Sequence, residues 1–266
     1  MHGMEPARVR DLFDAQVRRR GQADGSGAVA VAGGHVLRRV AAGGQGWSGI
    51  TWSELDEGCA DAVIAAQVAY FAGLGQQFEW KLYDYDRPAD LADRLTAAGL
   101  RPGDAEALMV AEVRDVPQDA ALPAGVRLVP VTEETGVDLL IEVHERVFGT
   151  DHSALHRALL TQLRTAPDMT AMVVAMAGDE AVCSARIEFL PGGQFASIWG
   201  GGTLPAWRRK GIYRAIVAYR ARLAAARGYR FLQVDASSDS QPILARLGFV
   251  RLARTTPFVW VPPAAV

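Results

Sequence analysis

Residues Thr203 to Arg220 read TLPAWRRKGIYRAIVAYR, the most informative stretch of the chain. From Ile212 onward the apolar residues recur every three or four positions, the spacing of one helical face, which predicts a helix beginning near Gly211. Three basic residues, Arg208 to Lys210, stand immediately before this start. Cations there oppose the helix dipole, whose N-terminal end is already positive. An anion outside the chain would explain their placement.

The predicted helix start suits a phosphate group. The first N–H groups of a helix have no carbonyl partner inside it and point outward, a geometry that phosphate oxygens fit. Gly211 lets a ligand approach the backbone closely, and Arg208, Arg209 and Lys210 add charge that a pyrophosphate would neutralise. Taken alone, the loop is explained equally well as a solvated basic surface.

The composition is that of a globular protein with a real core. Half of the 266 residues are hydrophobic and 22% are charged, and the length favours two domains at roughly 100 to 200 residues each. A formal net charge of −2 gives no bulk attraction to nucleic acid or to an anionic membrane. The two cysteines, Cys59 and Cys183, lack metal-type spacing, so neither a disulfide nor a metal site is expected. With no secretion signal and no membrane-length apolar run, we expect a cytosolic protein.

The first half predicts an alternation of strands and helices. After a helix over 5–20, the order is a hairpin at Gly33-Gly34, a helix from Leu55 to Phe71 introduced by GWSGITWSEL, strand FEWKLYDY, a helix from Ala89 to Ala98 and strand EALMVAEV. Residues 115–125, DVPQDAALPAG, hold two prolines and no periodicity, and are predicted to be a linker. We therefore expect one domain over 1–114 and a second over 126–266.

The second half predicts strand VRLVPV, two helices, strands MTAMVVAM, AVCSARIEFL and QFASIWGGGT, the Gly211 helix, strand YRFLQVDA, a short helix from Ser240 to Arg246 and a last strand ending in FVWV. The strands on either side of the Gly211 helix are expected to pair in parallel, because short loops join them to it. Two similar segments, LTAAGLRPGDAEALMV and LARLGFVRLARTTPFVW, place Gly99 and Gly248 at a shared corner, which indicates an internal duplication.

This order of elements resembles the GNAT superfamily of acyl-CoA-dependent N-acetyltransferases over residues 126–261. The family's loop reads Gln or Arg, two residues, Gly, one residue, and Gly or Ala; RRKGIY from Arg208 fits it, with Pro205 three residues ahead. The resemblance implies an α/β (α+β) fold with two GNAT-like mixed β-sheet domains and flanking helices, the C-terminal one carrying the acyl-CoA slot. The first half lacks such a loop and is expected to be a degenerate copy that walls the acceptor cleft.

The resemblance also implies a site for acetyl-CoA. The pantetheine arm would lie beside the strand end at Gly201, Gly202 and Thr203. The pyrophosphate would be wrapped by the loop and the first helical turn, namely Arg208, Arg209, Lys210, Gly211, Ile212, Tyr213 and Arg214. Tyr213 departs from the family's Gly or Ala, so its side chain must point away from the phosphates.

The family's usual proton-transfer residues are missing. A glutamate on the strand before the loop aligns with Ser197, and a tyrosine before LGF aligns with Leu244. Such groups accelerate a reaction by roughly 100- to 10,000-fold, although positioning alone supplies a comparable factor. The candidate substitutes are Asp235 with Ser237 and Ser238 beside the slot, Glu188 on the neighbouring strand, and His144, Glu145, Asp151 and His152 over the acceptor site. Each also has an ordinary explanation as a cap or an exposed polar residue.

Two functions remain open. The first is an enzyme that moves an acetyl group from acetyl-CoA to a primary amine of a small molecule or peptide, by direct attack on the thioester. The second is a catalytically weak or inactive acyl-CoA-binding protein. Neither involves nucleic acid, a membrane or a metal, and the sequence assigns no oligomeric state.

Overall fold

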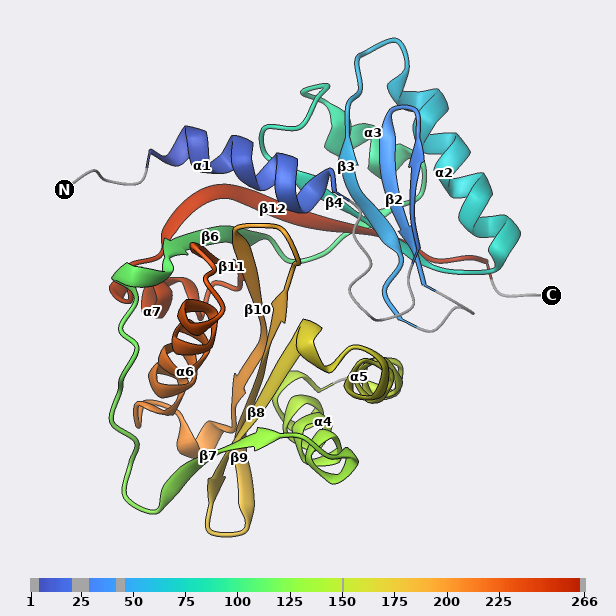
Figure 1. Cartoon of the computed structure of the whole chain (residues 1–266). Coiled ribbons are helices and arrows are strands. Elements are labelled where there is room, and N and C mark those ends of the chain that lie inside the picture. The colour runs from blue at the N-terminus through green and yellow to red at the C-terminus, as the bar shows by residue number, and fades with distance from the viewer. Residues whose placement is uncertain (1–4, 21–28, 42–45, 150, 264–266) are drawn as a thin grey trace.

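The computed structural model describes residues 5–20, 29–41, 46–149 and 151–263. Its first half alternates strands and helices, as the sequence predicts (Figure 1). The elements are α1 (Pro6–Phe13), the π-helical turn η1 (Asp14–Arg18), β1 (Val29–Gly33), β2 (Val36–Val40), β3 (Gly49–Ser53), α2 (Ala60–Leu74), β4 (Phe78–Tyr83), α3 (Leu91–Ala97), β5 (Arg101–Pro102), β6 (Glu106–Glu112) and the 3₁₀ turn η3 (Val113–Asp115).

The second half follows the predicted order throughout. Its elements are β7 (Val126–Val131), α4 (Glu134–Phe148), α5 (Ser153–Thr165), the 3₁₀ turn η4 (Pro167–Met169), β8 (Thr170–Ala177), β9 (Glu180–Phe189), β10 (Phe195–Thr203), the 3₁₀ turn η5 (Pro205–Trp207), α6 (Ile212–Ala226), β11 (Phe231–Ala236), α7 (Gln241–Arg246) and β12 (Val250–Trp260). None of the helices in the described part of the chain has the length and apolar character to span a bilayer.

The start of α2 differs from the prediction. The helix begins at Ala60 rather than at Leu55, and β3 occupies part of the stretch expected to lead directly into it. Asp56 explains the delay, because its Oδ1 accepts hydrogen bonds from the amides of Gly58 and Cys59 and closes a turn ahead of the helix.

Twelve strands within the described residues form one mixed sheet that runs through both halves. Their order is β1-β2-β3-β4-β12-β6-β11-β10-β9-β8-β7, with β5 paired to β12. The two halves exchange strands, because β6 of the first half pairs with β11 and β12 of the second half pairs with β4. This confirms the expected fold of two mixed-sheet halves with flanking helices, and adds a crossing of strands between them.

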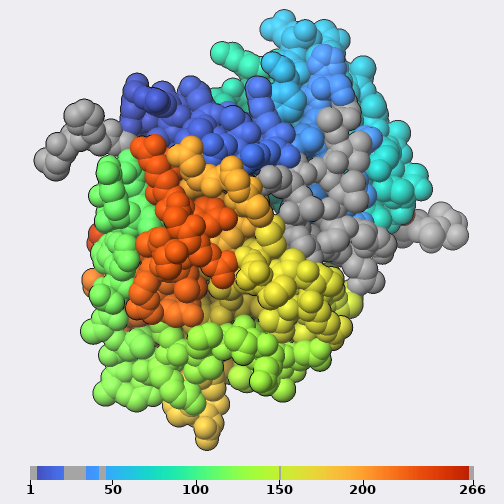
Figure 2. Space-filling model, in the orientation of Figure 1, coloured from blue at the N-terminus to red at the C-terminus, as the bar shows by residue number. Residues whose placement is uncertain are grey.

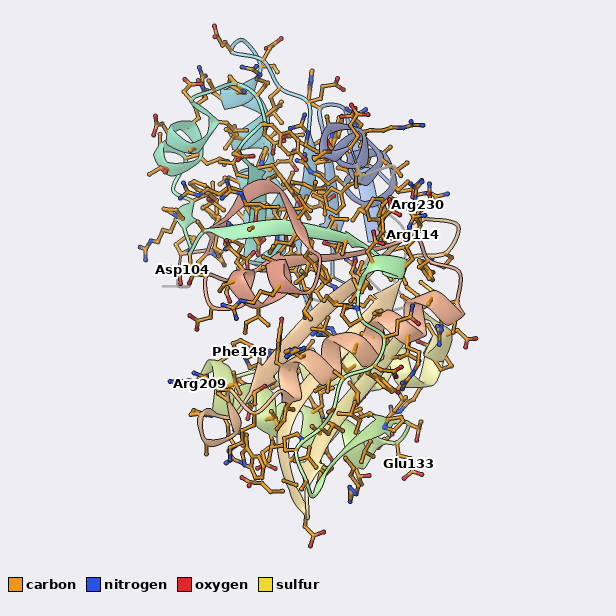
Figure 3. The ribbon with its side chains drawn as sticks, turned by 90° about the vertical axis from the view of Figure 1, so that its left-hand side faces the viewer. Asp104, Arg114, Glu133, Phe148, Arg209 and Arg230 are labelled. Carbon is orange, nitrogen blue, oxygen red and sulfur yellow. The ribbon has the colours of Figure 1, made fainter. Side chains whose placement is uncertain are left out.

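The crossing is held by a buried carboxylate. Glu112, at the end of β6, forms ion pairs with Arg114 at 2.7 Å and with Arg230 at 3.5 Å. Figure 3 shows these two arginines side by side where β6 ends and β11 begins. The first half is thereby fastened to the strand that borders the predicted slot.

The two halves repeat one arrangement around this crossing. The pair β3 and β4 is parallel with α2 between them in sequence, and the pair β10 and β11 is parallel with α6 between them. Gly99 and Gly248, which follow α3 and α7, have left-handed φ angles of 89° and 94°. The predicted parallel pairing and the shared glycine corner are both present in the structure.

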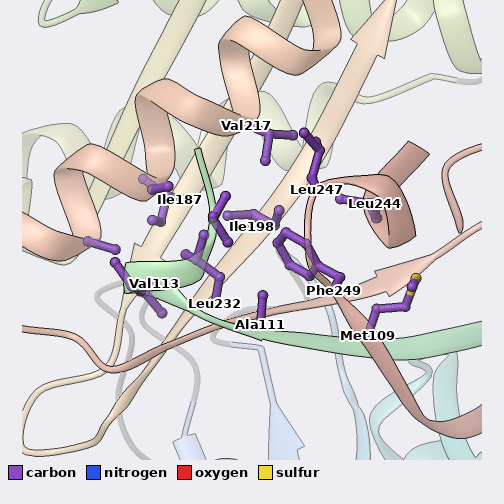
Figure 4. Close-up of a cluster of buried hydrophobic side chains, with 14 of the residues drawn as sticks. Met109, Ala111, Val113, Ile187, Ile198, Val217, Leu232, Leu244, Leu247 and Phe249 are labelled. Atoms are coloured by element: carbon purple, nitrogen blue, oxygen red, sulfur yellow. The ribbon is translucent and has the colours of Figure 1, made fainter. Parts of the chain in front are cut away.

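Helices cover both faces of the C-terminal sheet. On one face, α6 and α7 bury an apolar cluster that includes Met109 and Ala111 of the exchanged strand β6 together with Ile198, Leu232 and Val217 (Figure 4). On the other face lie α4 and α5. Figure 2 shows α1, in dark blue, lying along the boundary between the two halves, and its Val9 and Phe13 are buried in an apolar cluster with residues of both halves. Burial of these side chains joins the first half to the second.

Candidate active site

The strands β10 and β11 pair only near their starts. In the described chain their parallel ladder ends at Ser197↔Gln233, and β10 slips out of register with β9 between Trp199 and Gly202. Gly200, inside the irregular stretch, has a φ of 59°, in the left-handed region that favours glycine. The edge of β10 that faces β11 is therefore open beyond Ser197, and its backbone groups are available to a ligand.

The first turn of α6 faces the loop with free backbone donors. Gly211 is the N-cap residue with a φ of 87°, and no side chain of the described residues caps this helix start. Among the described non-glycine residues Arg209 alone has a positive φ, 60°, which turns the backbone sharply before Gly211. Arg209 and Lys210 are both exposed. Open amides next to two exposed cations fit a diphosphate, the anionic part of coenzyme A.

Contacts made by Arg208 and Lys210 hold the loop close to the end of β10. Arg208 Nε donates a hydrogen bond to the Thr203 carbonyl at 3.1 Å, and Lys210 Nζ lies 4.6 Å from the centre of the Trp207 ring. A Cβ atom built on Gly202 would lie 3.2 Å from Phe148 Cε2. Figure 3 shows Arg209 and Phe148 at the same end of the C-terminal half. The last turn of α4 thus forms an apolar wall beside the strand end.

The bulky side chain of Tyr213 points into the protein, away from the loop. A Cβ atom built on Gly201 would lie 2.9 Å from Tyr213 Cε2, so the ring fills the space that the glycine leaves. Burial raises the pKa of Tyr213. The position where the family prefers a small residue is therefore accommodated, and the amide of Tyr213 remains in the first turn of α6.

A cavity of about 710 Å³ opens on the sheet face opposite α6, between the two halves. Side chains of both halves line the cavity, and those of the second half include residues of α5 and of the loop before it. Its polar and aromatic lining residues include Lys81, Tyr83, Glu106, Asp151, His152, Arg186, Glu188, Ser197, Trp199, Gln233 and Asp235. The cavity therefore reaches β10 from the side where an acceptor could meet the opened strand edge.

Glu188 is the best-placed carboxylate in this cavity. On β9 it stands directly opposite Ser197 of β10, the position of the family's usual glutamate. Arg186 Nε bonds Glu188 Oε1 at 3.0 Å, and both side chains are largely buried. Arg186 was not predicted as a site residue, although the alternation of side chains along a strand places it on the same face as Glu188 and could have identified it.

The structure does not bring Asp235, Ser237 and Ser238 together at one site. Asp235 lines the cavity, and its Oδ2 lies 2.6 Å from Lys81 Nζ of the first half. Ser237 and Ser238 are exposed beyond the strand, where Ser237 lies in the turn that precedes α7. Leu244, at the position of the family's tyrosine, is fully buried in the core. Nothing in the sequence marked Lys81 as the partner of Asp235, because 154 residues separate them.

Histidines occupy the other side of Gly200. A Cβ atom built on Gly200 would lie 3.2 Å from His144 Cε1 and from Arg186 Nη1. The rings of His144 and His152 meet edge to face, with centres 4.3 Å apart. Burial, helped by the nearby His152 and Arg186, lowers the pKa of His144 to about 4, so its imidazole is neutral at pH 7. Glu145 accepts a hydrogen bond from the amide of His152, which joins the last turn of α4 to the start of α5.

The first half offers no comparable anion site at α2. The Asp56 carboxylate already occupies the amides of Gly58 and Cys59, and these hydrogen bonds lower its pKa. Among the described residues no group of three or more histidine, cysteine or carboxylate side chains is arranged to hold a metal ion. Of these two helix starts in the described chain, the start of α6 is the one with amides left open to an anion.

Comparison with known proteins agrees with this geometry. A search of curated proteins found no match. Solved structures resemble the whole chain at low identity. A GCN5-related N-acetyltransferase from Kribbella flavida is 17% identical with a TM-score of 0.68, covering 100% of this chain and 98% of its own. A tandem GNAT protein from the clavulanic acid biosynthesis pathway is 13% identical with a TM-score of 0.62, covering 98% and 96%.

The match to a sequence family falls on the part of the chain that carries the slot. The model of the acetyltransferase (GNAT) family matches residues 137–249, from α4 through the loop and α6 to the corner after α7. Its span includes the opened strand β10, the turn before α6 and Glu188. Residues 137–249 therefore match the acetyltransferase (GNAT) family.

Proposed function

We propose that this chain transfers an acetyl group from acetyl-CoA to the primary amine of a small molecule or peptide. The proposal depends on one arrangement around the open edge of β10. The free amides at the start of α6 lie beyond one end of this edge, and the polar cavity lies against the neighbouring sheet face. A thioester held along that edge would present its carbonyl carbon to the cavity. The family match of residues 137–249 supports acyl transfer in general, and the donor and acceptor named here are our inference.

The coenzyme would be held by backbone and cations. The amides of Ile212, Tyr213 and Arg214 open the helix toward the pyrophosphate, and Arg209 with Lys210 supplies charge. The pantetheine arm would lie beside Gly201, Gly202 and Thr203, as in the family. Acetyl-CoA supplies an activated acetyl group as a thioester, and the coenzyme leaves as a thiol.

Glu188 is our candidate for proton acceptor. A primary amine reaches the site as an ammonium ion at neutral pH, since its pKa lies near 10, and must lose a proton before it attacks. Glu188 lines the cavity one strand away from the family's usual glutamate position, and Arg186 fixes its orientation. Asp235 is less suited to this role, because Lys81 already neutralises its carboxylate.

The acceptor would be small or present a narrow end. The cavity lies between the two halves, and its volume of about 710 Å³ is that of a small-molecule site. Both cysteines are free, as a reducing compartment favours, and we place the reaction in the cytosol.

The absence of the family's usual acid and base favours a second candidate function. With Ser197 and Leu244 at those positions, the chain would bind acyl-CoA without turning it over at a useful rate.

Thiol release separates the two functions. The purified chain is given acetyl-CoA with a panel of small amines and amino-terminal peptides, and free thiol is followed over time, while calorimetry measures coenzyme binding. Enzyme function predicts amine-dependent thiol release. Binding without release for any amine supports the second function, and no binding of any CoA species overturns both.

A further inference from the structure

Arg220 is a buried cation for which the proposed reaction has so far required no role. It lies on α6, its residue is 1% exposed, and no described carboxylate forms an ion pair with it. Burial lowers its pKa, and the nearby Tyr213 and Cys183 offset part of this effect. A guanidinium group is costly to bury without an acidic partner. The hydrogen-bond partners of Arg220 therefore indicate its role.

Its contacts gather where β10 leaves the regular sheet. Nη1 donates to the carbonyl of Arg186 at 3.2 Å and to the carbonyl of Trp199 at 3.3 Å, and Nε donates to the carbonyl of Ile216. Arg186 and Trp199 are the facing pair on β9 and β10 immediately before the register slips. Nη2 has no hydrogen-bond partner among the described residues. Arg220 thus holds the last regular peptide of β10 from the side of α6.

These contacts fix the direction of the next amide. In a trans peptide the C=O and N–H groups point in opposite directions. The Trp199 carbonyl points toward Arg220 and β9, so the N–H of Gly200 in the same peptide points away from them, toward the side where β10 and β11 separate. The left-handed φ of Gly200 then turns the chain, and a Cβ atom there would come within 3.2 Å of both His144 and Arg186.

We propose that Arg220 is a positioning residue that aims the Gly200 N–H at the acyl oxygen of the bound thioester. The inference rests on the proposed function and assigns to Arg220 the orientation of that donor. Preorganised donors of this kind are worth about 100- to 1,000-fold in rate because they need no rearrangement during the reaction. Tyr213 packs between the phosphate loop and Gly201, so it joins the loop to the same stretch of β10.

The Gly200 amide can be observed alone. Trp199-Gly200 is the sole Trp-Gly pair in the sequence, so a sample labelled with ¹³C-carbonyl tryptophan and ¹⁵N-glycine gives a single HNCO resonance. We expect this resonance to move further on addition of acetyl-CoA than on addition of coenzyme A, because the acyl oxygen is the added acceptor. Equal movement with the two ligands overturns the inference.

A conservative variant tests Arg220 itself. R220K keeps the charge but cannot reach both strand carbonyls, so we expect kcat to fall about 10- to 100-fold, with the Kd for coenzyme A and the KM for the amine within twofold of wild type. The acetyl-dependent movement of the Gly200 resonance should shrink as well. R222K, on an exposed turn of the same helix, is the matched control. Unchanged kcat in R220K, or a loss carried entirely by KM, contradicts the inference.

The results also distinguish a failure of the proposed function from a failure of the role proposed for Arg220. If the wild-type chain binds no CoA species, the proposed function fails. If it binds and reacts but the Gly200 resonance ignores the acetyl group, only the role of Arg220 and Gly200 fails. Should R220K not fold, as a thermal melt would reveal, R220Q gives a second test of Arg220, because glutamine cannot bridge the two strand carbonyls. An acetyl-dependent movement of the Gly200 resonance in R220Q equal to that of wild type contradicts the inference.

Discussion

The ring of Tyr213 lies against Gly201, so close that a Cβ atom on the glycine would come within 2.9 Å of Tyr213 Cε2. This contact joins the start of α6 to the opened strand. It explains how a large residue stands in a loop where the family prefers Gly or Ala, because the strand gives up a side chain to make room. The two positions form one packing unit.

Replacing Gly201 should show that the space at this position depends on the ring of Tyr213. We expect Gly201→Ala to lower the free energy of unfolding by about 1–3 kcal/mol, since the added methyl group would press against the partly buried Tyr213 ring. In a Tyr213→Ala background the same change should cost little. Urea unfolding of the four proteins in this cycle measures the coupling. An equal cost in both backgrounds would show that the ring does not restrict Gly201.

The cations of the loop should act on coenzyme binding and not on folding. Arg209 and Lys210 are exposed, so changing both to alanine should leave the unfolding midpoint unchanged. Calorimetry should show coenzyme A affinity reduced about tenfold or more, with a weaker dependence on salt. Arg251→Ala, an exposed change on β12, is the control. Unaltered affinity in the double variant argues against a diphosphate at this loop.

The role proposed for Glu188 predicts a loss in rate without a loss in binding. Glu188→Gln keeps the shape of the side chain but cannot accept the amine proton, so kcat should fall about 100-fold at neutral pH. Coenzyme A affinity should stay within twofold of wild type. Glu142→Gln, on the exposed side of α4, should keep full activity. A fully active Glu188→Gln enzyme would move the search for the base elsewhere in the cavity.

Buried His144 should make the protein sensitive to mild acid. Its pKa is lowered from 6.5 to about 4 by burial, with His152 and Arg186 adding to the effect. The folded state then binds fewer protons than the unfolded state, so this contribution to stability is present above pH 6.5 and is lost as the pH falls toward 4.

Urea unfolding between pH 7 and 4.5 can test this. In His144→Phe the slope of unfolding free energy against pH should decrease by up to about 1.4 kcal/mol per pH unit, the value for one proton. A slope identical to that of wild type would mean that His144 titrates normally in the folded protein.

Each chain should bind one coenzyme. The amides ahead of α2 already bond Asp56, whose negative charge would repel a phosphate. Titration calorimetry with coenzyme A should therefore give a stoichiometry of one. A second site of comparable affinity would show that the first half has kept a coenzyme function.

Local pattern predicted most of the elements. The period of apolar residues after Gly211 gave α6 almost to the residue, because that helix buries one continuous face. The strand β3 was missed because GITWS is short and lies directly before a turn made by Asp56, whose hydrogen bonds depend on the folded loop. Boundaries set by such side-chain contacts leave little trace in periodicity.

The candidate site was predicted only where it is local in sequence. The loop proposed to hold phosphate is a continuous segment, and α6 begins directly after it as the sequence predicts, while its binding role stays a prediction. The cavity is different, since Lys81, Arg186 and Asp235 come from three strands whose neighbours are set by the tertiary fold. The grouping of Asp235 with Ser237 and Ser238 followed adjacency in the chain, and the end of β11 at Ala236 separates them.

The exchange of β6 and β12 restricts how the sequence of this chain can evolve. Because each half completes its sheet with a strand from the other, neither can be discarded, even though the proposed coenzyme contacts all lie in the second half. The first half can therefore change the side chains that it presents to the cavity while it still completes the sheet. In the function proposed here, such changes would admit new acceptors without altering the turn before α6.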